Sequence, residues 1–277
     1  MPRCPHPLLR AAAALATAGL ALLLAGCAVP TAATDTAARL AALGSAYDVL
    51  LLGEQHDAPD HHRIERETVQ ALAAQGRLAA LALEMAEEGT TTVALPRAAD
   101  EGAIRAALRW NDSAWRWGDY GPAVVAAVRA GVPVIGANLP RGALRLAMQD
   151  VSLDAQLAPD ALARQQDAIR DGHCGLLPAA QTGPMTRVQI ARDRAMAHAL
   201  AESVRPPRVA LLIAGAGHVD AALGVPQHLP ADLRIRSVQL RAGEGAGGAA
   251  GRFDAVWTTP PVAAKDYCAE LRTAPKH

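Results

Sequence analysis

The sequence predicts an α/β fold: a mainly parallel central sheet with helices on both faces, followed by a pair of antiparallel strands. Four short apolar runs, each bounded by glycine or proline, have the length and composition of buried strands. Helical segments alternate with these runs between Tyr47 and Val219, which is typical of parallel sheets whose crossovers are helices. The four runs cover residues 47–52, 78–83, 132–135 and 208–213.

Helix-start and helix-stop residues bound the helices between these runs. Pro59 and Pro122 stand where a proline favours the first helical turn, and Gly76 and Gly131 stand where glycine ends a helix. The longest helix begins at Pro184 and carries a mostly apolar stripe. The predicted helices cover residues 59–74, 101–108, 122–130, 142–149, 159–170 and 184–203.

Two further features follow from the rest of the chain. Residues 152–183 are expected to form an inserted helical lobe above the sheet edge. Residues 234–240 and 252–258 have strand composition and are joined by the Gly/Ala-rich loop 242–251. We therefore expect a C-terminal hairpin or antiparallel edge.

The N-terminus has the features of a secretory signal. Arg3 and Arg10 precede an apolar stretch at residues 11–24, which is too short and too rich in alanine for a confident membrane span. The following Leu-Ala-Gly-Cys, which ends at Cys27, resembles the lipobox of bacterial lipoproteins. That resemblance implies cleavage before Cys27 and acyl chains, palmitate among them, on that residue. An ordinary signal peptide with a chance cysteine is the alternative.

This interpretation divides the chain into a signal peptide at 1–26, a lipidated tether at 27–38 and one α/β domain at 39–277. Ala28 follows the lipobox cysteine, and by resemblance to bacterial sorting rules that implies an outer-membrane lipoprotein that faces the periplasm. In such a compartment, Cys174 and Cys268 could form a disulfide or remain buried thiols.

The charge pattern excludes nucleic acid as an expected partner. The chain has 27 basic and 27 acidic side chains, and no basic run or stripe appears among them. The basic residues therefore have to be interpreted one by one, as members of a site or of the solvated surface.

The apolar runs end on polar residues that can do chemistry. His56 and His218 each follow a run through a glycine-containing turn, Glu84 directly follows six apolar residues, and Asn138 follows the third run. Ligands bind outside the carboxyl ends of the strands in open α/β sheets. We therefore expect these four side chains to converge at one edge and to form a metal site, a proton relay or a binding site.

Several neighbours of these residues have two interpretations each. Glu54 belongs to the site or caps the next helix, and Arg141 holds a carboxylate or simply lies at a solvated helix start. His61 and Glu65 have the spacing of a helical pair, while His62 points toward the sheet edge.

Aromatic residues concentrate in one segment of a chain that is 3% aromatic. Trp110, Trp115, Trp117 and Tyr120 build a flat apolar pocket or an exposed partner surface, or else they pack over the helical lobe. A tyrosine oxygen can bind ferric haem. His173 and Met185, in or beside the lobe, could face a cofactor as well.

Five ordered motifs carry a family resemblance over residues 47–229. They are Gly53-Glu54-Gln55-His56, Leu83-Glu84-Met85, Asn138-Leu139-Pro140-Arg141, Ala191-Arg192-Asp193-Arg194-Ala195-Met196-Ala197 and Ala214-Gly215-Ala216-Gly217-His218-Val219. Together they resemble the ChaN family of iron-regulated bacterial lipoproteins, which belongs to a superfamily with Tiki proteases, TraB proteins and erythromycin esterases. The resemblance implies an α/β fold, a periplasmic or surface location and haem as the ligand.

A haem-binding role in iron uptake would use apolar contacts, an iron ligand and cations for the propionates. Trp115, Trp117 and Met185 are the expected contacts, and Arg141 or Arg116 is expected to meet a propionate. Tyr120 or a histidine is expected to bind the iron. The full set of expected haem-site residues is His56, Glu84, Trp115, Trp117, Tyr120, Asn138, Arg141, His173, Met185 and His218.

The superfamily also implies an alternative, a metal-dependent protease or esterase. In that alternative, His56, Glu84 and His218 hold a divalent metal, and a metal-bound water attacks the substrate. The expected partners are haem, a membrane reached through the lipid anchor, a haem receptor or transporter, and a second copy of the chain.

Overall fold

The computed structural model describes residues 32–244 and 251–273. The predicted signal peptide, the lipobox Cys27 and the middle of the loop 242–251 lie outside the described residues. Among the helices that are described, none is both long enough and apolar enough to cross a membrane.

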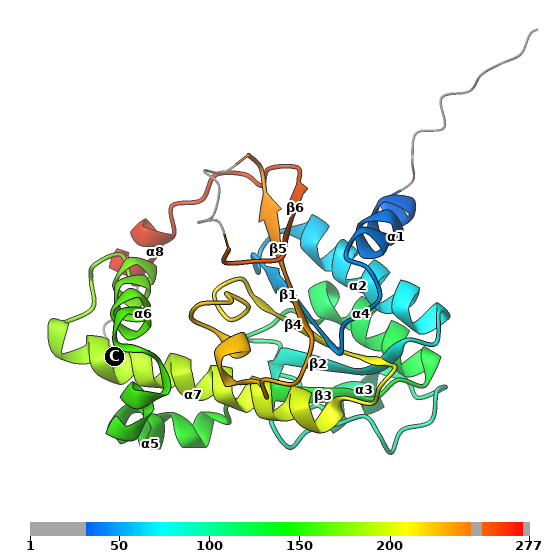
Figure 1. The fold of residues 1–277 in the computed structure, drawn as a ribbon, viewed down its shortest axis with the longest axis horizontal. Coiled ribbons are helices and arrows are strands. Elements are labelled where there is room, and N and C mark those ends of the chain that lie inside the picture. The colour runs from blue at the N-terminus through cyan, green and yellow to red at the C-terminus, as the bar shows by residue number, and fades with distance from the viewer. Residues whose placement is uncertain (1–31, 245–250, 274–277) are drawn as a thin grey trace, which may run out of the picture. The chain divides into compact units, whose positions relative to one another are not determined.

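Six parallel strands form the central sheet, in the order β3-β2-β4-β1-β5-β6 (Figure 1). The mainly parallel α/β fold expected from the sequence is therefore confirmed. All carboxyl ends lie at the same edge, because every neighbouring pair runs in the same direction. The strands are β1 (Val49–Glu54), β2 (Leu78–Glu87), β3 (Val134–Asn138), β4 (Val209–Gly215), β5 (Ile235–Ala242) and β6 (Ala255–Thr259).

Helices cover both faces of the sheet, because alternate strand residues point to opposite sides. Leu50 and Leu52 of β1 belong to a core cluster with α2 and α4, while Val49 and Leu51 belong to a second cluster with α7. The helices of the first face are α1 (Ala32–Ala42), α2 (Pro59–Ala74), α3 (Glu101–Ala107) and α4 (Trp117–Ala130), and the main helix of the second face is α7 (Ala179–Ser203) (Figure 1).

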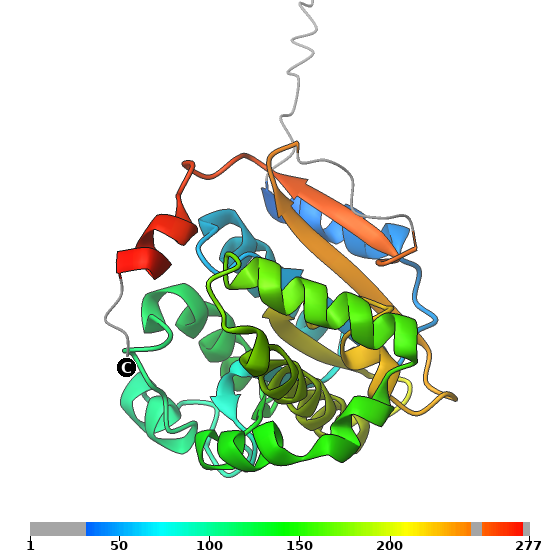
Figure 2. The ribbon, with the colours of Figure 1, turned by 90° about the vertical axis from the view of Figure 1, so that its left-hand side faces the viewer.

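The segment expected to be an inserted lobe is not a separate unit. It contains the 3₁₀ helix η2 (Val151–Gln156) and α6 (Pro159–Gly172), which pack with α5 (Leu144–Gln149) on the first half of α7. Figure 2 shows α6 and α7 from this side. Because α7 continues directly onto the sheet and packs against β3, the helices of this segment extend the second helical layer.

The expected antiparallel hairpin is also wrong, because β6 pairs with β5 in parallel. Val238 lies opposite Ala255, and Ala242 lies opposite Thr259. Two parallel strands need a connection of about a dozen residues, because the chain must return to the edge at which the first strand began. Residues 243–254 between β5 and β6 are long enough for this. Strand composition predicted the two strands correctly, but it carries no information on their relative direction.

Several helix ends differ from the sequence-based expectation. α4 and α7 begin five residues before Pro122 and Pro184, so both prolines lie inside their helices. α1 begins at Ala32, within the range assigned to a tether, and Thr36 Oγ1 donates a hydrogen bond to Glu67 Oε2 of α2 at 2.5 Å.

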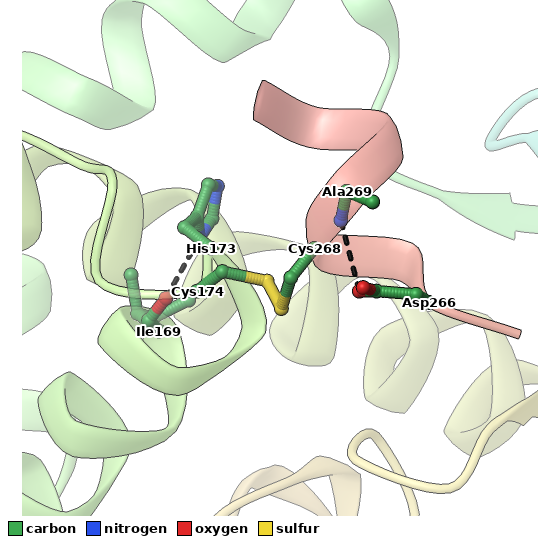
Figure 3. Close-up of a disulfide and its surroundings, with 6 residues drawn as sticks. All are labelled: Ile169, His173, Cys174, Asp266, Cys268 and Ala269. Atoms are coloured by element: carbon green, nitrogen blue, oxygen red, sulfur yellow. Dashed lines mark hydrogen bonds between the residues drawn. A yellow bond between two sulfur atoms is a disulfide. The ribbon is translucent and has the colours of Figure 1, made fainter. Parts of the chain in front are cut away.

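A disulfide holds the C-terminal segment against the helical layer. After β6 the chain passes over the molecule to α8 (Tyr267–Thr273), as Figure 2 shows. Cys268 of α8 is bonded to Cys174, just beyond α6, with 5.6 Å between the Cα atoms (Figure 3). Of the two states left open for these cysteines, the structure therefore has the disulfide.

Candidate functional site

Polar side chains meet at the carboxyl edge of the sheet, and Glu84 lies at their centre. Its carboxylate is 3.4 Å from His218 Nε2 and 4.0 Å from His56 Nε2. Its backbone carbonyl accepts a hydrogen bond from Asn138 Nδ2 at 2.9 Å. The four residues that the sequence placed at the strand ends therefore converge, because the parallel sheet brings their strands to one edge.

Glu84 is ionised although it is buried. The pairing of β2 with β3 is irregular between Leu83 and Glu87, and within this stretch the Glu84 carboxylate accepts the Gly215 N–H at 2.8 Å. Burial alone would raise the pKa of Glu84, but the charge and hydrogen bond of His218, the charge of His56 and the Gly215 N–H lower it to about 2. A fixed negative charge thus lies between two histidines.

His218 is held as a cation between two carboxylates. Its Nδ1 lies 2.6 Å from Asp193 Oδ1 on α7, and its Nε2 faces Glu84. Burial would lower the pKa of His218, but the charges of Glu84 and Asp193 raise it to about 10. A protonated imidazole carries a proton on both nitrogens, so in this state His218 cannot bind a metal.

His56 is the most exposed of the site histidines, with 41% of its side chain accessible. Its Nδ1 lies 2.8 Å from Glu54 Oε1, and its ring meets the ring of Trp115 edge-on, with 4.9 Å between the centroids. Burial would lower the pKa of His56, but the hydrogen bond to Glu54 and the charges of Glu84 and Glu54 raise it. Glu54 therefore fixes the orientation of this ring and leaves Nε2 on the side of Glu84.

Glu54 joins the site and does not cap a helix. It is 2% exposed, and its Oε1 accepts the Tyr120 OH at 2.8 Å and lies 2.8 Å from His56 Nδ1. Its Oε2 lies 3.1 Å from His62 Nε2, but the two atoms do not have the geometry of a hydrogen bond. The residue before α2 is Ala58, which makes no side-chain cap. Burial would raise the pKa of Glu54, but the hydrogen bond with His56 and the nearby His62 ring lower it.

His61 and Glu65 do not pair as helical neighbours. His61 Nδ1 accepts the Gln55 N–H at 2.9 Å, while Glu65 faces Glu54 and His62. Burial and the nearby charge of Glu54 raise the pKa of Glu65 well above its ordinary value. His62 points toward the sheet edge, as the sequence predicted.

A cavity of about 540 Å³ opens beside Glu84, and we call it the aromatic cavity. His56 and Trp115 form one part of its wall, and Arg109, Arg141 and Arg192 bring three positive charges to it. Its other lining residues are Glu84, Met85, Ala86, Glu87, Asn111, Ala114, Asn138, Leu139 and Leu144.

A second cavity, of about 480 Å³, lies on the other side of His56. Glu54, His218 and the turn after β4 line it, together with Lys265 and Tyr267 from the C-terminal segment. Tyr267 OH also donates a hydrogen bond to Asp57 Oδ2 at 2.5 Å. The segment that the disulfide holds therefore covers one side of the site.

Six residues that were expected to meet the haem do not line the aromatic cavity, and one of them, His218, lines the second cavity instead. Tyr120 is 2% exposed and bonded to Glu54, and Trp117 donates to Glu101 at 2.6 Å. His173 Nδ1 is bonded to Ile169 O of its own helix, beside the disulfide (Figure 3). The other two, Met185 and Arg116, lie on α7 and just before α4.

Three residues of the site were not predicted individually. Asp193 and Arg192 lie in the fourth of the five sequence motifs, but a helix pattern alone does not show which positions face the sheet edge. Arg109 has a left-handed backbone conformation, with a φ of 47°, just after α3. The one available signal was the clustering of charged residues in that fourth motif.

Known proteins match the part of the chain that carries the site residues. A family model described as haem-binding uptake, Tiki superfamily, ChaN, matches residues 40–229. Among solved structures, one of cofacial haem binding to ChaN of Campylobacter jejuni is 24% identical, with a TM-score of 0.62, and the alignment covers 76% of this chain and 87% of that one. At this identity, the similarity concerns the fold.

Two further solved structures match with lower identity. The type III effector HopBA1 is 16% identical over 82% of this chain and 94% of its own, with a TM-score of 0.43. A Bacillus cereus protein is 13% identical over 77% and 70%, with a TM-score of 0.44. No curated protein matches this chain in sequence.

The family match spans β1 to β4, the strands that bring His56, Glu84, Asn138 and His218 together. The sequence motifs and this match point to the same family, and the parallel sheet is the fold expected for it. The chain belongs to the ChaN family of haem-binding uptake proteins in the Tiki superfamily.

Proposed function

We propose that this protein binds haem in the aromatic cavity and serves haem uptake. The observation that carries the proposal is a cavity lined by an aromatic ring, a histidine and three arginines that form no ion pair within the described part of the chain. The cavity volume of about 540 Å³ falls within the range of small-molecule sites. Family membership and the haem bound by ChaN of Campylobacter jejuni support the same ligand.

The residues of the cavity fit the parts of a haem. Trp115 offers an apolar ring, and Met85, Leu139 and Leu144 add apolar surface. Arg192 Nε is buried without a hydrogen-bond partner in the described chain, which is the state of a donor that awaits an anionic oxygen. Arginine binds carboxylates through paired hydrogen bonds, so Arg192, Arg109 and Arg141 are the residues to hold the propionates.

His56 is the candidate iron ligand. Metal-binding histidines commonly donate their other ring N–H to a carboxylate, and His56 has this arrangement with Glu54. Tyr120 is less suitable, because ligation needs the phenolate, and burial together with the charge of Glu54 raises the pKa of Tyr120. Haem, when bound, would supply the iron chemistry, and Glu54 would hold the His56 ring so that Nε2 is the ligating nitrogen.

The hydrolase alternative has less support. The family model that matches the chain and the ChaN structure are both described by haem binding, and neither description names a hydrolytic activity. We therefore do not favour a metal site made of His56, Glu84 and His218.

A haemin titration followed through the Soret band tests the proposal. Wild-type protein should bind at micromolar haemin, and Trp115→Ala should weaken binding by at least about tenfold, or ~1.4 kcal/mol. Trp117→Ala is the matched control and should bind as the wild type does, because Trp117 lies outside the cavity. No Soret shift with the wild-type protein would refute haem binding.

The same titration separates the two ligand candidates. His56→Ala should change the Soret and charge-transfer bands of the complex, while Tyr120→Phe should leave them as in the wild type. The reverse pattern would exclude His56 as the ligand.

We also propose that lipid on Cys27 anchors the protein in the outer membrane, facing the periplasm, where haem can pass to a receptor or transporter. The lipobox and the preceding signal features support this. Intact-mass analysis of the native protein should show the acyl chains, and Cys27→Ser should remove them. A native protein of unmodified mass would contradict the proposal.

A further inference from the structure

A second group of ligating side chains lies behind His56. Glu54, His62 and Glu65 each place one ligand atom within 4.8 Å of the others. Glu54 and Glu65 are 2% and 0% exposed, and the His62 side chain is 10% exposed. Two carboxylates and an imidazole at these separations have the composition of a transition-metal site.

The positions of these three side chains are determined by the strand and the helix that carry them. Glu54 is the last residue of β1, while His62 and Glu65 are separated by one turn of α2 and therefore share a face of that helix. Glu54 is also oriented by Tyr120 OH, which donates to it at 2.8 Å. Rigid elements and a hydrogen bond behind a ligand are what hold a metal-binding side chain in position.

The hydrogen-bonding state of the group is incomplete. Glu65 is fully buried, and neither of its oxygens has a hydrogen-bond partner in the described chain. Glu54 Oε2 and His62 Nε2 are 3.1 Å apart, but both lack a hydrogen bond of acceptable geometry. Two atoms that bind the same ion with bonds of about 2.0–2.2 Å lie about this far apart. Their lone pairs then point to the ion, so no hydrogen bond forms between them.

We propose that Glu54, His62 and Glu65 bind a divalent first-row transition-metal ion. The ion satisfies the unpartnered atoms of Glu65, Glu54 and His62 at once, where an internal hydrogen bond satisfies at most two of them. The mixed oxygen and nitrogen set suits Zn²⁺, Mn²⁺ or Fe²⁺ better than Ca²⁺, which prefers oxygen alone.

This site is distinct from the proposed haem site. Neither His62 nor Glu65 lines the aromatic cavity, and neither belongs to the Glu84 cluster. The two sites are nevertheless connected, because Glu54 contacts His62 with one oxygen and His56 with the other. Because His62 and Glu65 lie outside the aromatic cavity, metal uptake can be measured on full-length protein in the absence of haem.

The test is metal content and affinity after removal of metals and reloading with Zn²⁺ or Mn²⁺. The wild-type protein should bind one equivalent, and Glu65→Gln and His62→Asn should each weaken binding by at least about tenfold. Glu67→Gln is the matched control, because Glu67 is a buried carboxylate of the same helix that bonds instead to Thr36 and Arg63.

The outcomes separate this proposal from its rivals. Absence of stoichiometric metal in wild-type protein, or equal affinity of wild type and Glu65→Gln, overturns the site. Loss of metal in Glu84→Gln with retention in Glu65→Gln overturns it as well and assigns the ion to the Glu84 cluster. The circular dichroism spectrum of Glu65→Gln serves as the folding control, because it reports on the fold whether or not haem or metal binds.

Discussion

At the scale of single residues, Glu54 receives polar groups from three elements. Tyr120 comes from α4, His62 from α2 and His56 from the turn after β1. Removing the carboxylate would leave the buried Tyr120 OH without an acceptor, which costs about 1–3 kcal/mol. The same residue thus orients a candidate iron ligand and holds a candidate metal, so a change there cannot affect one site alone.

His61 is expected to make the protein less stable in mild acid. Burial lowers the pKa of His61 to about 4 from an ordinary value of 6.5. Between these values the unfolded chain binds a proton that the native protein does not, so the free energy of unfolding falls as the pH falls through this window. The loss is up to about 3 kcal/mol, and urea unfolding at neutral pH and near pH 4 measures it.

A His61→Gln variant should lose less stability than wild-type protein over the same pH range. It should retain some pH dependence, because burial also lowers the pKa of His228 to about 4. His198 has a side chain that is 62% exposed, so His198→Gln is the control and should behave as the wild type does. Equal acid sensitivity of His61→Gln and wild-type protein would contradict the interpretation.

At the scale of elements, the end of β4 packs too closely on the site to accept a side chain at Gly215, its last residue. A Cβ atom on Gly215 would lie 2.9 Å from His56 Nε2 and 3.6 Å from Glu84 Oε2. Gly215→Ala should displace His56 and weaken haemin binding by at least about tenfold, because the candidate iron ligand loses its position. Soret titration of the variant measures this.

The turn that follows β4 contains a matched control, Gly217. No atom lies within 4 Å of a Cβ built on Gly217, so Gly217→Ala should bind haemin as the wild type does. If the two alanine variants lose affinity equally, the turn acts through its general flexibility and not through the contact with His56.

Helix starts show where local sequence rules fail. Proline is favoured in the first turn, and this rule predicted starts at Pro122 and Pro184. Both helices begin earlier, because a proline in the second turn removes only one backbone hydrogen bond, which other interactions can offset. In α4, Asp112 accepts the N–H of Trp117 at 3.1 Å and so stabilises the earlier start.

At the scale of the whole molecule, the sequence predicted the sheet and the centre of the site for one reason. Parallel strands end at one edge, so polar residues that follow the strands must meet there. This logic placed His56, Glu84, Asn138 and His218 without knowledge of any contact. It did not reach Asp193, because a residue on a helix faces the site only once the packing of that helix is known.

The direction of β6 and the positions of His173 and Met185 were beyond sequence reasoning for a related cause. A strand pattern is the same read in either direction, and the choice between parallel and antiparallel pairing depends on the path of the whole chain. Likewise, helical spacing predicts a face but not the neighbour that the face contacts. His173 ends α6 beside the disulfide, in the helical layer that was expected to form a lobe.

The disulfide should stabilise the whole domain without forming the haem site. Cys174 and Cys268 are separated by 94 residues, and a cross-link over such a loop contributes about 4–5 kcal/mol in the chain-entropy model. The Cys174→Ser, Cys268→Ser double variant should therefore unfold at lower urea concentration. Haemin affinity should be unchanged, because neither cysteine lines the aromatic cavity.

Reductant provides the control for this comparison. Wild-type protein under reducing conditions should match the double variant in stability, and the double variant should not respond to reductant. Equal stability of the oxidised wild type and the double variant would contradict a contribution from the cross-link.

The same cross-link makes a closed ring of the chain between Cys174 and Cys268, and that ring contains α7, β4, β5 and β6. A protease that nicks the ring once releases no fragment, because both new ends stay attached through sulfur. Asp193 and His218 lie within the ring, and Glu84 lies outside it. A nicked molecule in an oxidising compartment can therefore keep both halves of its site in one covalent unit, and only reduction allows them to separate.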